Sequence, residues 1–179
     1  NRTVCDHCSD YHFVYHEDYK QNLVRENLPA ENIYVVGNTI VEVCGTEFKR
    51  RKELNQIILD IHRPENFKYK TRLANILFYA NLCMHKYKVP VKLLKFGRTM
   101  DYISKHNVSI GNVELVDLMP YKQYLKAQYD SLFLISDSGT GQEEPALLQT
   151  PVIVPRDYTE RPQSMDNNCS VMINVNTPS

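Results

Sequence analysis

Continuous hydrophobic runs alternate with amphipathic stretches along most of this chain. Runs rich in Ile, Leu and Val, which predict buried strands, lie at 56–61, 91–95, 131–135 and 152–154. Shorter extended runs lie at 11–15, 32–36, 113–115 and 171–173. Stretches with apolar residues at helical spacing lie at 17–27, 66–87, 99–105, 122–127 and 141–148, and a charged stretch that predicts a further helix lies at 47–54.

Continuous apolar strands separated by helices predict an α/β fold with a parallel sheet covered on both faces. Ligands of such sheets bind at the carboxyl ends of the strands. The residues just after Ile61, Lys95 and Ile135 are therefore candidates for a site. A domain boundary is expected near 45–47, where a strand-and-turn region gives way to the charged helix.

The charge balance restricts the partners. The 179 residues carry 21 Lys and Arg against 21 Asp and Glu, so neither nucleic acid nor a membrane surface is an expected partner. The 12 tyrosines could stack on nucleic-acid bases, but the zero net charge favours half-buried packing residues instead. No apolar run reaches about 18 residues, so we expect no transmembrane helix.

The cysteines bear on compartment and metal binding. Their odd number, 5, suits a reducing compartment, and hence a cytoplasmic protein, better than a disulfide framework. Cys5 and Cys8 precede His12 and could suggest zinc, but the gap between Cys8 and His12 is far shorter than the ~12 residues of the usual finger. We therefore predict no metal site. The alternative is a helix-to-strand segment with Val4, Cys8 and Tyr11 buried.

The strand at 131–135 runs into a turn of small residues and then a helix. Ser138 and Gly139 lie in this turn, where bare backbone N–H groups and the positive end of the helix could bind a diphosphate. Glu144, in the first turns of the helix, could accept hydrogen bonds from the vicinal hydroxyls of a ribose. A plain helix cap at Asp137 or Ser138 is the structural alternative, and residue chemistry alone leaves both open.

Two arginines follow the next strand. Arg156 and Arg161 are natural phosphate ligands, because a guanidinium is planar and permanently charged. They could equally pair with the neighbouring Asp157 and Glu160, as most exposed arginines do.

A histidine follows the strand at 56–61, in the segment 60–66. His62 would face the same crevice and could donate a hydrogen bond, or a proton, to a phosphate. An isolated histidine is more often structural, which is the alternative here.

Together these segments resemble the non-hydrolysing UDP-N-acetylglucosamine 2-epimerases. The similar motifs are HRPENF at 62–67, DSGTGQEEP at 137–145 and RDYTERPQ at 156–163, with YHF, QNLVREN and GNTIVE in the same order at 11–13, 21–27 and 37–42. Each motif alone is unspecific, but the combination spans almost the whole chain. The resemblance implies two Rossmann-like domains in the glycosyltransferase-B arrangement, with 1–46 as the end of the first domain and 47–179 as the second, UDP-binding domain.

The resemblance implies an isomerase that inverts C2 of a UDP-linked 2-acetamido sugar. UDP leaves in an anti elimination and adds back with the opposite configuration at that carbon, which needs a base and a stabilised diphosphate but no cofactor. The implied catalytic positions are Glu17 and His62, and further carboxylates are expected upstream of Asn1. The implied positions that bind the UDP-sugar are Arg63, Tyr124 near the uracil, Ser138, Gly139, Glu144 on the ribose, and Arg161. A homodimer is also implied.

Two departures from the family pattern leave the sugar open between N-acetylglucosamine and a 6-deoxy relative. Lys95-Phe96-Gly97-Arg98 stands where the family has His-x-Asn-Pro, and Thr140-Gly141 stands where Gly precedes an aliphatic residue. A UDP-sugar glycosyltransferase of the same fold and a catalytically inactive UDP-sugar-binding domain are the alternatives. The histidine segment at 62–67 favours the epimerase over the glycosyltransferase.

Overall fold

The computed structural model describes residues 2–44 and 54–175. The chain divides into two compact units, Asn1–Gly45 and Thr46–Ser179. The helix predicted at 47–54 lies almost wholly outside the described residues. No helix among the described residues is long and apolar enough to cross a membrane.

The first unit is a strand–helix–strand unit with flanking helices. Its elements are α1 Arg2–His7, β1 His12–Val14, α2 Glu17–Arg25, the 3-10 turn η1 Ala30–Asn32, β2 Ile33–Val35 and α3 Ile40–Cys44. β1 and β2 pair in parallel, with His12 opposite Ile33, which confirms the predicted strand–helix–strand order. The His16 side chain accepts a hydrogen bond from the amide of Asp18 and so caps α2, which carries acidic residues in its first turn and Arg25 in its last.

The predicted burial near the start of the chain is wrong. Val4 and Tyr11 are 67% and 62% exposed, and Cys8 is exposed as well. The physical reason is that α1, with only 6 residues, buries none of its side chains.

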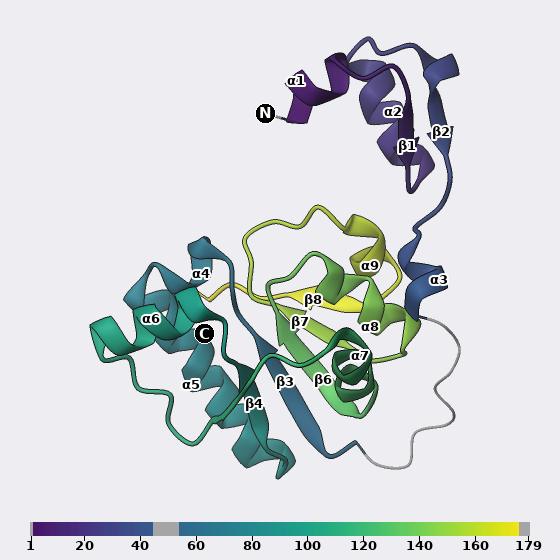
Figure 1. Cartoon of the computed structure of the whole chain (residues 1–179). Helices are drawn as coiled ribbons and strands as arrows, with labels where there is room; N and C mark the ends of the chain where they lie inside the picture. Colours follow the sequence, from purple (N-terminus) through teal and green to yellow (C-terminus); the bar gives the residue numbers. More distant parts are fainter. Residues whose placement is uncertain (1, 45–53, 176–179) are drawn as a thin grey trace. The chain divides into compact units, whose positions relative to one another are not determined.

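The second unit is a six-stranded parallel sheet with helices on both faces (Figure 1). Its strands are β3 Gln56–Asp60, β4 Val91–Leu94, β5 Glu114–Val116, β6 Ser131–Ser136, β7 Val152–Val154 and β8 Ser170–Met172. Its helices are α4 Pro64–Phe67, α5 Lys70–Tyr87, α6 Gly97–His106, α7 Tyr121–Tyr129, the 3-10 turn η2 Thr140–Gln142, α8 Glu144–Leu147 and α9 Pro162–Asp166. The α/β class and the parallel sheet are thereby confirmed.

Alternation along the central strands divides the core between the two faces. Ile57 and Leu59 pack in one cluster with α5, through residues such as Leu73 and Ile76. Ile58 and Leu134 lie in the other cluster, against residues of α7. The central strand β3 is buried at every position, which explains why its sequence is a continuous apolar run rather than an alternating one.

The strand order β5-β4-β3-β6-β7-β8 is the Rossmann-type order. The chain runs from β3 to β5 on one side and then returns to place β6 beside β3, with Leu59 opposite Ile135. The carboxyl ends of β3 and β6 therefore meet at the point where the order reverses, and ligands of such sheets bind at this point.

Two predicted helices are interrupted. The helix expected at 66–87 is divided into α4 and α5, because Tyr69 takes an extended conformation between them. The helix expected at 141–148 is a 3-10 turn followed by the four-residue α8. Pro145 lacks an N–H group and fits only the first turn of a helix, which explains why α8 begins at Glu144.

Candidate active site

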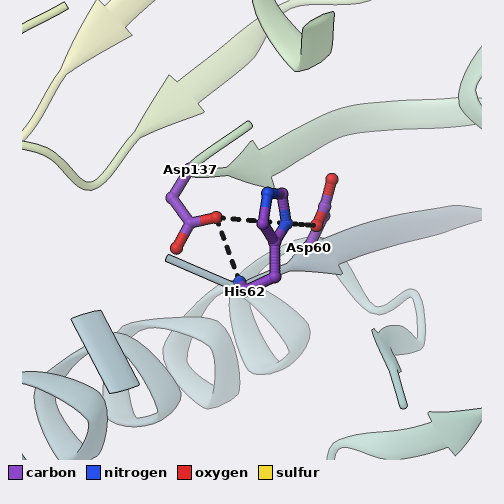
Figure 2. Close-up of side chains that lie close together, drawn as sticks. All are labelled: Asp60, His62 and Asp137. Atoms are coloured by element: carbon purple, nitrogen blue, oxygen red, sulfur yellow. Dashed lines mark hydrogen bonds and ion pairs between the residues drawn. The ribbon is translucent and has the colours of Figure 1, made fainter. Parts of the chain in front are cut away.

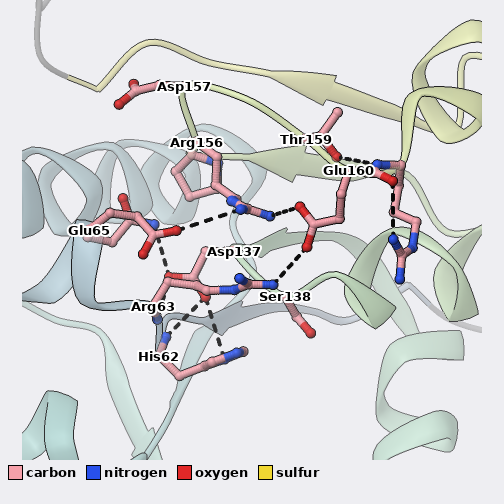
Figure 3. Close-up of polar contacts among 12 residues, drawn as sticks. His62, Arg63, Glu65, Asp137, Ser138, Arg156, Asp157, Thr159 and Glu160 are labelled. Carbon is pink, nitrogen blue, oxygen red and sulfur yellow. Dashed lines mark hydrogen bonds and ion pairs between the residues drawn. The ribbon is translucent and has the colours of Figure 1, made fainter. Parts of the chain in front are cut away.

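Loops that follow β3, β6 and β7 meet at one edge of the sheet, where Figure 3 shows Arg63, Ser138 and Glu160 close together. A Cβ atom added to Gly139 would lie 3.3 Å from Glu160 Oε1, 3.6 Å from Arg63 Nη2 and 4.0 Å from Arg161 Nη2. Three of the segments singled out in the sequence therefore come together at one edge of the sheet. Gly139 has φ −66° and ψ −50°, which any residue can adopt, so space rather than backbone conformation calls for glycine here.

His62 lies between two carboxylates (Figure 2). Its Nδ1 atom is 2.9 Å from Asp60 Oδ1 and 3.5 Å from Asp137 Oδ1, and its ring centroid is 4.9 Å from that of Phe96. The hydrogen bond with Asp60 raises the pKa of His62, and it outweighs burial, which lowers it. The side chain of His62 is 33% exposed, so the ring is held from one side and open on the other.

The second oxygen of Asp60 accepts two hydroxyl hydrogen bonds. Tyr124 Oη donates to Asp60 Oδ2 at 3.1 Å, and Ser136 Oγ donates to the same atom at 3.2 Å. Burial, with the neighbouring Asp60 charge, raises the pKa of Tyr124 well above its usual range, so Tyr124 keeps its proton as a donor. Tyr124 is the residue predicted to lie near the uracil. Its hydroxyl thus points toward Asp60, the carboxylate beside His62.

Asp137 connects the loop after β6 to the loop after β3. Its carboxylate accepts hydrogen bonds from the amides of His62 at 3.1 Å and Arg63 at 3.0 Å, and from Asn66 Nδ2 at 2.9 Å. Burial raises the pKa of Asp137, while these hydrogen bonds oppose the rise. Asp137 thus binds the backbone of the segment that precedes α4. The structural alternative predicted instead that Asp137 would cap the helix that follows it in sequence.

The buried Arg72 extends this network into the first turn of α5. Its Nε atom donates to Asn66 Oδ1 at 2.6 Å, and Nη1 lies 3.1 Å from both oxygens of Asp157. Its Nη2 atom donates to the carbonyl of Pro155 at 3.3 Å. A single guanidinium therefore joins the Asn66–Asp137 pair to the loop after β7.

The turn at 138–139 differs from the predicted anion cradle. The amide of Ser138 donates to Ser136 Oγ at 3.1 Å, and Ser138 Oγ lies 3.1 Å from Thr140 Oγ1. The following helix α8 has only 4 residues, so it supplies little of the expected dipole. Gly139 is buried, and within the described part of the chain its amide makes no hydrogen bond. The amide of Ser138 is thus already paired with Ser136, and the binding of a diphosphate by Gly139 stays a prediction.

Glu144 is 4% exposed and is held by two donors. Its Oε1 accepts from Tyr121 Oη at 2.9 Å, and its Oε2 accepts from Gln128 Nε2 at 2.7 Å. Burial raises the pKa of Glu144, and these two hydrogen bonds oppose the rise. Each carboxylate oxygen has a second lone pair, so the pair of donors orients Glu144 without using up its capacity to accept further hydrogen bonds.

Glu160 joins two arginines. Its Oε1 accepts from Arg63 Nη2 at 3.1 Å and its Oε2 accepts from Arg156 Nη1 at 2.8 Å (Figure 3). Burial raises the pKa of Glu160, but hydrogen bonds from its own backbone and from Arg156 outweigh it and lower the pKa overall. Arg156 is 2% exposed and its guanidinium lies 4.9 Å from the ring centroid of Tyr158, so the pairing with Glu160 that the structural alternative expected is present, and its role as a phosphate ligand stays a prediction.

Arg161 lies at the other edge of this group. Its Nε atom donates to Glu143 and its Nη1 atom donates to the Glu160 carbonyl at 3.1 Å. Its amide donates to Thr159 Oγ1 at 3.0 Å, which fixes the backbone of this loop. The side chain of Arg161 is 25% exposed, so part of the guanidinium still reaches solvent.

Glu17, the predicted catalytic carboxylate, lies in the first unit. It is the first residue of α2, it is exposed, and its Oε1 accepts from Gln21 Nε2 at 2.9 Å. The catalytic role of Glu17 stays a prediction, for an exposed carboxylate in the first turn of α2.

Among residues 2–44 and 54–175, the one group of three metal-ligating side chains with ligand atoms within 4.8 Å of one another is Asp60, His62 and Asp137. Hydrogen bonds to hydroxyls, to amides and to His62 itself account for this arrangement, and we do not assign a metal to it. Cys5 and Cys8 belong to no such group among the described residues.

Sequence reasoning did not assign a role to Asp60, Tyr121 or Gln128. Asp60 carried a usable signal, because it is the carboxylate that ends an apolar strand two residues before His62. Tyr121 and Gln128 carried none, since only the packing of α7 beside Glu144 brings them to the site.

Known proteins match this chain over nearly its whole length. The sequence model of the UDP-N-acetylglucosamine 2-epimerase family matches residues 1–179. The chain is similar to the UDP-N-acetylglucosamine 2-epimerase of Methanocaldococcus jannaschii, with 29% identity over 98% of this chain and 53% of the relative. The chain thus spans about half the length of the curated relatives it matches.

Solved structures agree with the sequence comparison. The crystal structure of the Methanocaldococcus jannaschii enzyme in complex with UDP-GlcNAc and UDP matches with a TM-score of 0.84 and 27% identity, over 98% of this chain and 53% of that one. The enzyme from Neisseria meningitidis bound to UDP-GlcNAc matches with a TM-score of 0.74 and 28% identity, over 93% of this chain and 50% of that one.

Proposed function

This chain belongs to the UDP-N-acetylglucosamine 2-epimerase family, and on that basis we propose that the whole protein inverts C2 of UDP-N-acetylglucosamine without releasing the sugar from UDP as a hydrolysis product. The observation that carries the proposal is the convergence of Arg63, Arg161 and Glu160 on Gly139 at the reversal point of the sheet. Two guanidinium groups beside a backbone amide that makes no hydrogen bond among the described residues would provide the charge and the donors that a diphosphate requires.

The proposed roles follow from placement. Gly139, Arg63 and Arg161 bind the diphosphate, with Ser138 contributing its hydroxyl rather than its amide. Glu144, oriented by two donors, accepts hydrogen bonds from the ribose.

Two further roles concern the uridine and the chemistry. Tyr124 closes the site on the uracil side, with its hydroxyl on Asp60. His62 assists the departure of UDP, because its ring is held by Asp60 and open on one side. Glu17 is proposed as a catalytic carboxylate, and no cofactor is proposed.

The decisive experiment uses the full-length protein. It is incubated with UDP-N-acetylglucosamine in heavy water, and proton NMR follows both the C2 position and the appearance of the manno isomer. We expect deuterium at C2 and an equilibrium mixture of the two UDP-sugars, with no accumulation of free sugar. No exchange and no manno product would contradict the proposal. Transfer of the sugar to an added acceptor would favour the glycosyltransferase, and binding of UDP alone would favour an inactive domain.

We also propose that the whole protein is a cytoplasmic homodimer, as the resemblance implies. The exposed thiols of Cys5 and Cys8 suit a reducing compartment. Light scattering coupled to size exclusion tests the dimer, and cell fractionation tests the location.

A further inference from the structure

We propose that Asp60 is the positioning residue of His62: its carboxylate holds the imidazole with Nδ1 directed inward, so that Nε2 is the atom that faces the departing UDP. This inference rests on the proposed function, because it assumes that His62 assists the departure of UDP. It concerns a residue to which the family motifs give no role.

The backbone between the two side chains is fixed on both sides. Asp60 is the last residue of β3. Its carbonyl accepts a hydrogen bond from the amide of Asp137, just after β6, at 3.1 Å. The Ile61 carbonyl accepts from Thr99 Oγ1 at 2.7 Å, and the His62 amide donates to Asp137. The backbone that carries Asp60 and His62 is therefore held in place, and this fixes how their side chains approach one another.

The Asp60 carboxylate has one orientation available. Its Oδ2 accepts from the hydroxyls of Tyr124 and Ser136, which leaves Oδ1 for His62 Nδ1 at 2.9 Å. A carboxylate that accepts from three donors requires His62 to carry a hydrogen on Nδ1. Neutral His62 is then the Nδ1–H tautomer, and Nε2 makes no hydrogen bond to any residue in the described part of the chain.

The groups around His62 favour its protonated form on balance. Asp60 and Asp137 favour the imidazolium, whereas Arg63 and burial oppose it, and the net result is a raised pKa. Tyr124 stays neutral because burial raises its pKa, and Phe96 covers the ring without charge. Protonated His62 thus keeps one N–H on Asp60 and has the other, on Nε2, for the ligand.

The role follows in the elimination step. A base removes the proton from C2, the C1–O bond breaks, and its electron pair leaves with the phosphate oxygen of UDP. The Nε2–H of protonated His62 passes its proton to that oxygen, and the neutral imidazole keeps its Nδ1–H on Asp60. In the return step, UDP adds back to C1 from the face that it left and its oxygen returns the proton to Nε2, while a carboxylic acid of the site delivers a proton to the opposite face of C2. C2 is thereby inverted, and the base and the acid exchange their protons with solvent before the next turnover, so atoms and charges balance.

The test is Asp60→Asn in the full-length protein, with Asp117→Asn as the matched control. Asn keeps the shape and can still accept from Tyr124 and Ser136, but it removes the charge beside His62. Asp117 is 87% exposed and pairs only with Lys95 among the described residues, so its amide variant removes a carboxylate charge that makes no direct contact with His62. Histidine is labelled with nitrogen-15, and the signal that disappears in His62→Gln identifies His62.

Two readouts are expected to move together. The NMR titration midpoint of His62 falls by roughly one pH unit or more in Asp60→Asn and stays unchanged in Asp117→Asn. With UDP-N-acetylglucosamine as substrate, kcat falls about 10-fold to 100-fold while KM changes by less than about 2-fold, and the alkaline limb of the kcat profile moves to lower pH. A merely structural role for Asp60 would not shift the titration midpoint and the pH profile in parallel.

The outcomes separate the two proposals. An unchanged His62 midpoint in Asp60→Asn overturns the positioning role, and so does a shifted midpoint with an unaltered kcat. A wild-type protein that does not exchange C2 hydrogen contradicts the proposed function instead, and the titration still decides whether Asp60 controls His62. If Asp60→Asn does not fold, Tyr124→Phe is used instead. Loss of the Tyr124 hydroxyl makes Asp60 a stronger acceptor for His62, so the NMR titration midpoint of His62 should rise. A constant midpoint would overturn the positioning role of Asp60.

Discussion

Asp137 accepts a hydrogen bond from the backbone amide of His62 at 3.1 Å, so a side chain of one loop fixes the backbone of another. Replacing Asp137 with Ala leaves this amide, the amide of Arg63 and Asn66 Nδ2 without their acceptor. An unsatisfied buried donor costs about 1–3 kcal/mol. We therefore expect Asp137→Ala to lower the free energy of unfolding by about 3 kcal/mol or more, as measured by urea denaturation.

The control for this prediction is Asp117→Ala. Asp117 is 87% exposed and pairs with Lys95 on the surface, where an ion pair contributes about 0–1 kcal/mol. Equal losses of unfolding free energy in the two variants would show that the hydrogen bonds of Asp137 add no more stability than a surface ion pair.

Gly139→Ala tests the packing at the proposed diphosphate site. The new methyl group would lie 3.3 Å from Glu160 Oε1, so Glu160 and the adjoining arginine must move slightly, although the backbone conformation suits alanine. We expect UDP to bind about 10-fold more weakly, which is about 1.4 kcal/mol, with stability changed by less than about 1 kcal/mol. Isothermal titration calorimetry with UDP measures the first quantity.

Gly97→Ala is the matched substitution. A Cβ atom at Gly97 meets nothing within 4 Å, and Gly97 is the first residue of α6. Alanine there should leave UDP affinity unchanged and stabilise the protein by a few tenths of a kcal/mol up to about 1 kcal/mol. Parallel losses of UDP affinity in both variants would argue against a diphosphate beside Gly139.

Glu144→Gln separates the proposed ribose contact from packing. Gln128 Oε1 is buried and makes no hydrogen bond among the described residues, so a rotated Gln128 amide can accept from the new amide group. The fold should therefore tolerate the change, whereas the loss of charge should weaken UDP binding about 10-fold in calorimetry. Undiminished affinity would remove Glu144 from the ribose site.

The raised pKa of His62 predicts a pH-dependent stability. A group that binds its proton more tightly in the native state stabilises the fold fully below its unfolded pKa of about 6.5, and that contribution disappears as pH rises through the higher native pKa. The difference in unfolding free energy between wild type and His62→Gln should thus be larger at about pH 5.5 than at about pH 9. A difference that grows with pH would contradict the Asp60–His62 hydrogen bond.

The second unit was predictable because its central strands, β3 and β6, are buried on both faces. Runs such as 56–61 and 131–135 appear as continuous apolar segments, and parallel pairing follows from the helices between them. The breaks at Tyr69 and before Glu144 were not predicted, because helical spacing continues across each of them and only backbone geometry shows the interruption.

The sequence predicted where the site lies in the fold, but it did not predict most of the contacts between the residues of the site. The rule that ligands bind at carboxyl ends placed His62 and Ser138 at the same edge, and the structure brings them there. The partners of buried polar atoms depend on distances across the sheet, so neither the use of the Ser138 amide by Ser136 nor the burial of Arg156 could be read from residue types.

The guanidinium of Arg72 limits how the protein can be re-engineered. It lies in the first turn of α5, away from the proposed ligand, yet it reaches His62 through Asn66 and Asp137 in an unbroken series of hydrogen bonds. Mutant libraries that aim at a new sugar specificity should keep these residues constant. Substitutions at Arg72 would alter the reactivity of His62 although Arg72 itself contacts no substrate.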